Sequence, residues 1–196
     1  DQISLRAMAT DQNMTYAYFA YKIPVGGSGL RVGATYSGTS YRLGKELASS
    51  ESHGTATVGS LVAVYPFIRS QKSNLSGTLT LEKKQLNDVL ATGPVDKQVQ
   101  LATFGLAGDR RDVFGGGGIT LFDLSLATGS LSMDDVSLLT DKLSAQTNGS
   151  FTRLDYRLNR LQRLSDSYSL LLALSGQFAN KNLNSSEQFF LGGAYG

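Results

Sequence analysis

The residues best suited by type to do chemistry lie around His53, the one histidine of the chain. The stretch ASSESHGTAT places Glu51 and Ser52 directly before it, after two further serines. A hydrolase needs a nucleophile, a base and an orienting group in fixed geometry, which adjacent residues of a polar loop rarely provide. We interpret this stretch as a solvated loop, and we predict no catalytic residue and no enzymatic activity.

Neither phosphate nor metal chemistry is indicated. The glycines at 115–118 are followed by neither Lys-Ser/Thr nor a helical pattern, so they predict a flexible turn rather than a phosphate-binding loop. The chain has no cysteine, and Asp134 and Asp135 are better explained by helix capping than by metal binding. We therefore predict no metal site and no bound cofactor.

The remaining chemical candidates are three charges at alternate positions, Arg153, Asp155 and Arg157. They alternate with Leu154, Tyr156 and Leu158. Because successive side chains of a strand point to opposite faces, one face of this segment is charged and the other is apolar. The pattern predicts a strand between two very different environments.

The same period of two runs through the whole chain and predicts nine strands. The connections between them alternate between short turns and longer loops, which is typical of an antiparallel meander. The expected long loops include 46–54, 86–97 and 132–149, and the last of these holds a helical pattern capped by Ser132 and Asp135. The predicted strands cover roughly 2–8, 14–25, 30–47, 55–70, 74–85, 98–110, 119–131, 150–163 and 167–178.

Composition limits the class of protein. The 196 residues include 18 basic and 16 acidic side chains, a net charge of +2, so we expect no nucleic-acid partner. No segment approaches the roughly 18–20 continuous apolar residues of a membrane helix, whereas a membrane-spanning strand needs only about 9–11. The start DQISLRAM lacks the features of a secretory signal, so any such signal is expected upstream of Asp1.

Period two alone leaves two folds open, a soluble β-sandwich and a transmembrane β-barrel. Long predicted strands and charged clusters on the polar face favour the barrel. Aromatic residues near strand ends also favour it, because membrane barrels carry aromatic girdles at the two interfaces. The residues counted toward such girdles are Tyr16, Tyr18, Tyr41, Tyr65, Phe67, Tyr168 and Phe178.

The C-terminal stretch RLDYRLNRLQRLSDSYSLLLALSGQFANKNLNSSEQFFLGGAYG closely resembles the barrel domain of two-partner secretion transporters. These are the haemolysin-activator family (ShlB/FhaC/HecB) of the Omp85 superfamily. In that family a segment like SSEQFFLGGAYG leads into Val-Arg-Gly-Tyr/Phe. The upstream stretch GLAGDRRDVFGGGG is similar to a strand, turn and glycine run of the same family, and weaker similarity extends to Asp1.

The resemblance implies a fold and a place in a larger protein. Residues 1–196 would be the third to eleventh strands of a sixteen-stranded transmembrane β-barrel in the bacterial outer membrane. Two POTRA domains, a plug helix and two strands would precede Asp1. The arginine motif and five closing strands would follow Gly196, and Gly192 and Gly193 would form the approach of the loop to that motif.

The resemblance also implies a function, the export of one partner exoprotein of the haemolysin or adhesin type. The barrel is expected to be monomeric, to contact membrane lipid and lipopolysaccharide, and to work without a cofactor. Arg153, Asp155 and Arg157 would then line the lumen or contact a returning loop. A passive porin or adhesin barrel, or an Omp85-type insertase of outer-membrane proteins, remains the alternative.

Overall fold

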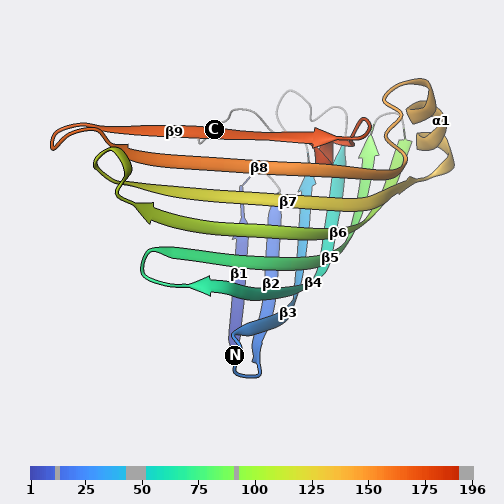
Figure 1. Ribbon diagram of the computed structural model, residues 1–196. Coiled ribbons are helices and arrows are strands. Elements are labelled where there is room, and N and C mark those ends of the chain that lie inside the picture. Colours follow the sequence, from blue (N-terminus) through green and yellow to red (C-terminus); the bar gives the residue numbers. More distant parts are fainter. Residues whose placement is uncertain (12–13, 43–51, 91–92, 190–196) are drawn as a thin grey trace.

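The structure is a computed structural model that describes residues 1–11, 14–42, 52–90 and 93–189. Its strands form one nine-stranded antiparallel sheet in the order of the sequence, curved into an open trough (Figure 1). The strands are β1 (Gln2–Ala9), β2 (Thr15–Val25), β3 (Leu30–Arg42), β4 (His53–Arg69), β5 (Ser73–Leu90), β6 (Gly93–Asp112), β7 (Gly118–Met133), β8 (Gly149–Arg163) and β9 (Ser169–Ala179).

The meander predicted from the sequence is confirmed. Each strand pairs with its neighbours along the chain, so that Tyr156 of β8 lies opposite Leu124 of β7 and Gly176 of β9. The turns β2–β3, β4–β5, β6–β7 and β8–β9 are short and lie at one end of the sheet. The described strands form a single sheet without a second one packed on it, so the sandwich alternative is wrong.

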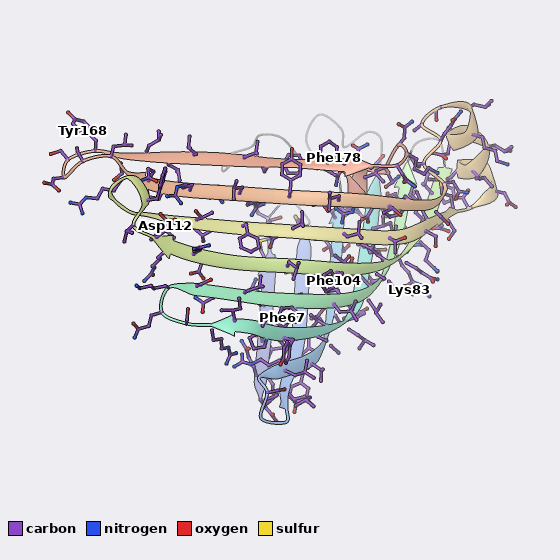
Figure 2. The ribbon with its side chains drawn as sticks, in the orientation of Figure 1. Phe67, Lys83, Phe104, Asp112, Tyr168 and Phe178 are labelled. Carbon is purple, nitrogen blue, oxygen red and sulfur yellow. The ribbon has the colours of Figure 1, made fainter. Side chains whose placement is uncertain are left out.

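The two faces of the trough differ in polarity, as the alternation predicts. One row of the convex face crosses four strands through Phe104, Leu126, Leu154 and Phe178, which are register partners. Phe104 is 48% exposed and Phe178 is 65% exposed (Figure 2). Such a continuous apolar surface requires an apolar environment rather than water. Arg153, Asp155 and Arg157 of β8 face the concave side, whereas Arg110, Asp112 and Arg160 share the parity of the convex side close to the short turns.

Three aromatic rings of the convex face lie over glycines of a neighbouring strand. A Cβ atom at Gly176 would lie 2.4 Å from the Tyr156 hydroxyl, and one at Gly108 would lie 2.9 Å from the Phe122 ring. Phe67 covers Gly77 in the same way. The glycines therefore leave room for rings that lie flat along the sheet.

The expected aromatic girdles are only partly present. By register, Tyr16, Tyr18 and Tyr41 lie on the concave face, where Tyr18 stacks under Arg6 and Tyr41 donates a hydrogen bond to Asp88. The prediction failed for these three because position near a strand end does not determine the face. Parity along the strand does.

The prediction of a long loop at 86–97 is wrong. There β5 and β6 continue as paired strands, with Leu86 opposite Lys97 and Leu90 opposite Gly93. Asn87 Nδ2 also donates to Asp96 Oδ1 at 2.7 Å. Polar residues pair their backbones as well as apolar ones do, so the loss of the apolar pattern did not mark the end of these strands. Similarly, β4 begins at His53, which the sequence placed in a loop.

The predicted helix in the loop after β7 is α1 (Asp135–Leu143), and its expected cap was wrong. Ser132 belongs to β7, and the N-cap is Asp134, whose carboxylate accepts hydrogen bonds from Val136 N and Ser137 N. Leu139 and Leu143 of α1 do not pack on the sheet, because they are 64% and 91% exposed. Within the described residues, no helix has the length and apolar character to cross a membrane.

Candidate functional site

The candidate site lies where the chain turns back onto the concave face after β9. Asn184 caps a short 3₁₀ helix, η3 (Ser185–Glu187), by accepting a hydrogen bond from Ser186 N. Just before it, Leu183 is buried in an apolar cluster on the inner wall. The other members of that cluster are Val99, Leu101, Ala127, Leu131 and Phe151. We call residues 183–189 the inner segment.

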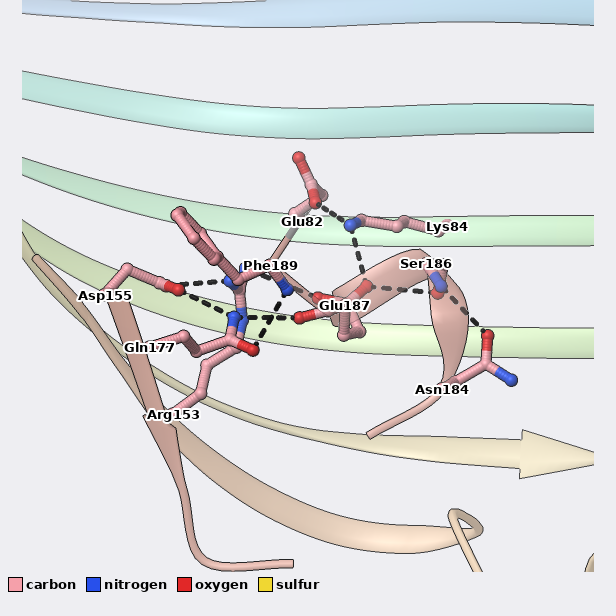
Figure 3. A network of polar contacts seen from close by, with 9 residues as sticks. All are labelled: Glu82, Lys84, Arg153, Asp155, Gln177, Asn184, Ser186, Glu187 and Phe189. Atoms are coloured by element: carbon pink, nitrogen blue, oxygen red, sulfur yellow. Dashed lines mark hydrogen bonds and ion pairs between the residues drawn. The ribbon is translucent and has the colours of Figure 1, made fainter. Parts of the chain in front are cut away.

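The carboxylate of Glu187 joins two strands of the wall. Its side chain is 1% exposed. Lys84 Nζ of β5 donates to Glu187 Oε1 at 2.8 Å, and Arg153 Nη2 of β8 lies 3.4 Å from Glu187 Oε2 (Figure 3). A buried charge is tolerated when oppositely charged groups and hydrogen bonds compensate for its lost hydration. Two cations from distant parts of the chain therefore fix the position of η3.

Gln177 of β9 holds the backbone of the same segment. Its Nε2 donates to the Glu187 carbonyl oxygen at 3.0 Å, and its Oε1 accepts from Phe189 N at 3.1 Å. The same Nε2 also donates to Asp155 Oδ1 at 2.7 Å. A side-chain amide offers both donors and an acceptor, so one glutamine pairs with two backbone groups of the segment as a neighbouring strand would.

The structure brings together two of the three charges singled out in the sequence. Arg153 Nη1 donates to Asp155 Oδ2 at 2.7 Å, and both residues belong to the network around Glu187. Arg157 lies on the same face but outside the network, opposite Asp123 and Ser175. With Asp123 and Asn74 it lines a hollow of about 420 Å³ in the wall. Gly192 and Gly193 lie outside the described residues, as do Ser49, Ser50 and Glu51.

A model of the family "Haemolysin secretion/activation protein ShlB/FhaC/HecB" matches residues 2–196. The chain belongs to this family. The family's proteins reside in the outer membrane of Gram-negative bacteria, as the sequence predicts. No solved structure matches the chain significantly.

Curated relatives of this ShlB/FhaC/HecB chain include the "Heme/hemopexin transporter protein HuxB" of Haemophilus influenzae strain KW20/Rd and that of strain 86-028NP. Each is 28% identical over 200 residues. The alignments cover 100% of this chain and 35% of each relative, so the chain spans about a third of their length.

Sequence reasoning missed Lys84, Gln177 and Glu187 as parts of a site in this ShlB/FhaC/HecB chain. A signal for Glu187 was available, since it is the only charged residue after Lys181. Lys84 carried a weaker signal, because it shares the polar face of its strand with Glu82. Nothing in their spacing indicates that residues 84, 153 and 187 meet, because that depends on how the strands curve.

The arrangement is suited to holding a segment by charge. Two of its buried atoms, Arg153 Nε and Glu187 Oε2, have no hydrogen-bond partner among the described residues. Within the same residues, no three His, Cys, Asp or Glu side chains gather as metal ligands. The site therefore combines close ion pairs with two buried polar atoms that lack a hydrogen-bond partner among the described residues.

Proposed function

We propose that the chain is part of the wall of an outer-membrane transporter that exports one partner protein by two-partner secretion. The exoprotein would cross the barrel unfolded and fold outside, without ATP or a bound cofactor. The observation that carries this proposal is the match of the ShlB/FhaC/HecB model to residues 2–196.

The geometry supports the proposal through the contrast between the faces. The apolar convex face, with Leu126, Leu154 and Phe178, would contact membrane lipid and lipopolysaccharide. The concave face would line the lumen of a monomeric, sixteen-stranded barrel. Arg153, Asp155 and Arg157 would then belong to the lumen wall, where alternating charges keep an extended polypeptide hydrated.

Two kinds of cargo fit the proposal. The sequence resemblance suggests an exoprotein of the haemolysin or adhesin type. The name of the Haemophilus relatives instead suggests an exoprotein connected with heme or hemopexin. Because 28% identity covers only part of those relatives, we infer the export of a partner protein first and its type second.

Deletion of the transporter's gene in its own host tests the function. We expect one large protein to disappear from the culture medium, as seen by mass spectrometry, and to return when the gene is supplied on a plasmid. Binding of the recovered protein to heme or hemopexin would then distinguish the two cargo types. An unchanged medium would contradict export, and a general loss of outer-membrane proteins would instead support an insertase.

A further inference from the structure

Both cations that Glu187 contacts have a second carboxylate on the wall itself. Lys84 Nζ lies 3.3 Å from Glu82 Oε1 as well as 2.8 Å from Glu187. Arg153 contacts two carboxylates as well: its Nη1 lies 2.7 Å from Asp155 Oδ2, and its Nη2 lies near Glu187. The wall is therefore neutral at this place without Glu187, with two cations balanced by two carboxylates.

A contact that only stabilises the fold does not need such spare partners. Removing one member of a buried ion pair is normally costly, because the other charge is left uncompensated. Here the departure of Glu187 would leave Lys84 with Glu82 and Arg153 with Asp155. Gln177 would likewise keep its hydrogen bond to Asp155 Oδ1 at 2.7 Å. Both cations of the wall would therefore keep a carboxylate partner if Glu187 moved away.

The contact with Glu187 is itself incomplete. Arg153 Nη2 approaches Glu187 Oε2 only to 3.4 Å, and the hydrogen-bonding capacity of Arg153 Nε and Glu187 Oε2 stays unused among the described residues. A two-bond pair between a guanidinium and a carboxylate would satisfy both atoms. Because Asp155 holds the guanidinium at 2.7 Å, Arg153 is divided between a strong partner on its own strand and a weak one on the inner segment.

The residues just before the inner segment are held differently from its tip. Lys181 Nζ donates to the Asn148 carbonyl at 2.6 Å, and Asn182 Nδ2 donates to the Ala145 carbonyl at 2.9 Å, both in the loop after α1. Leu183 adds a buried apolar anchor. The tip, from Glu187 to Phe189, contacts the wall through Gln177 and through the ion pairs of Glu187 with Lys84 and Arg153.

From these contacts we propose that Glu187 is a positioning residue of a releasable latch, which holds the tip of the inner segment against the lumen wall and lets it detach. This inference rests on the proposed function, because it assigns the segment to the transport path. Glu82 and Asp155 are the carboxylates that take over Lys84 and Arg153 when the tip leaves. The latch gives the barrel a closed state whose stability depends on a competition between carboxylates.

Single-channel recording of the full-length transporter in planar bilayers tests the latch, with the open-to-closed ratio as the readout. Glu187→Gln removes the charge of the tip and should raise that ratio roughly tenfold or more, the size expected for a lost charged hydrogen bond. Glu82→Gln and Asp155→Asn remove the spare partners and should lower the ratio, because release would then leave a cation unpaired. Asp123→Asn, a concave-face carboxylate outside the network, is the matched control and should leave the ratio unchanged.

Competition between the carboxylates predicts opposite signs for Glu187→Gln and for the two wall substitutions, whereas a tip that never detaches predicts no change in the open-to-closed ratio for any of the three. A rise in the open-to-closed ratio for Glu82→Gln and Asp155→Asn would overturn the proposal. So would an unchanged ratio for an assembled Glu187→Gln variant. Heat-modifiable migration in gels checks assembly, and if Glu187→Gln fails to assemble, the two wall variants still decide. A wild-type transporter that exports no protein would contradict the proposed function instead.

Discussion

Lys84 Nζ and Glu187 Oε1 lie 2.8 Å apart, although 103 residues separate them in the chain. The contact joins β5 to the segment after β9, and the four strands β6 to β9 lie between the two residues in the sequence. We expect the pair to be energetically coupled. In a double-mutant cycle of Lys84→Met and Glu187→Gln, the coupling free energy of unfolding should be about 1–3 kcal/mol. Unfolding of the transporter in phospholipid vesicles measures it, and strict additivity of the two substitutions would contradict the contact.

The ring of Tyr156 should make Gly176 sensitive to a single added methyl group. A Cβ atom there would lie 2.4 Å from the Tyr156 hydroxyl, so Gly176→Ala should destabilise the barrel by about 1–3 kcal/mol, the usual range for overpacking. Gly59 is the control, because a Cβ atom on it would meet nothing within 4 Å. The midpoint of thermal unfolding should fall for Gly176→Ala and stay close to wild type for Gly59→Ala. Equal effects would contradict the packing described for Tyr156.

The cap of α1 should make its loop sensitive to acid. Hydrogen bonds from the Ser137 side chain and from the backbone N–H groups of Ser137, Asp96 and Val136 lower the pKa of the Asp134 carboxyl. Since the folded pKa lies below the unfolded value of about 3.9, the stabilisation is present above that value. It is lost as the pH falls through the folded pKa. Pepsin cleavage in the loop, normalised to a reference peptide, should therefore increase as the pH is lowered below about 4.

Asp134→Ala should abolish that pH dependence and leave the loop easily cleaved throughout the acidic range. Asp135→Ala is the matched control, because Asp135 lies in the first turn of α1 but makes no cap. It should keep the wild-type profile. A pH profile that flattens in Asp135→Ala but not in Asp134→Ala would contradict the assignment of the acid response to Asp134.

Residues 1–196 expressed alone should not behave as a water-soluble monomer. The convex face would expose leucines and aromatic rings along β5–β9, and exposed apolar areas of this extent lead to association. Size-exclusion chromatography without detergent is the measurement, with a detergent-containing run as its control. A sharp monomer peak that melts cooperatively without detergent would contradict the membrane-facing role of the convex face.

Much of the fold could be predicted because alternation is a local property. Leu154, Tyr156 and Leu158 alternate with charges in the sequence, and the structure places the two sets on opposite faces. The extent of β5 and β6 was missed because polar residues such as Gln85, Asn87 and Asp96 continue the backbone ladder where the apolar alternation has weakened. The helix cap was assigned two residues too early, at Ser132, which belongs to β7.

The site could be predicted only in part, for a physical reason. Arg153 and Asp155 are neighbours along one face of one strand, which the period of two reveals. Lys84 and Glu187 reach them through the curvature of the sheet and the fold-back of the inner segment. Neither feature leaves a periodic trace in the sequence. The resemblance to a known family identified the stretch containing Glu187, but not the partners of its carboxylate.

The central claim, a barrel wall with a wet concave face and a lipid-facing convex face, is tested most directly by thiol labelling at two adjacent positions. The 196 residues contain no cysteine, so Arg157→Cys and Tyr156→Cys in the full-length transporter each introduce one thiol into this part of the chain. A charged, membrane-impermeant thiol reagent added to cells should modify position 157 through the lumen. It should leave position 156 largely unmodified, because an apolar environment excludes water and keeps the thiol protonated. Labelling of 156 without 157 would reverse the two faces, and equal labelling of both would contradict a membrane location for β8.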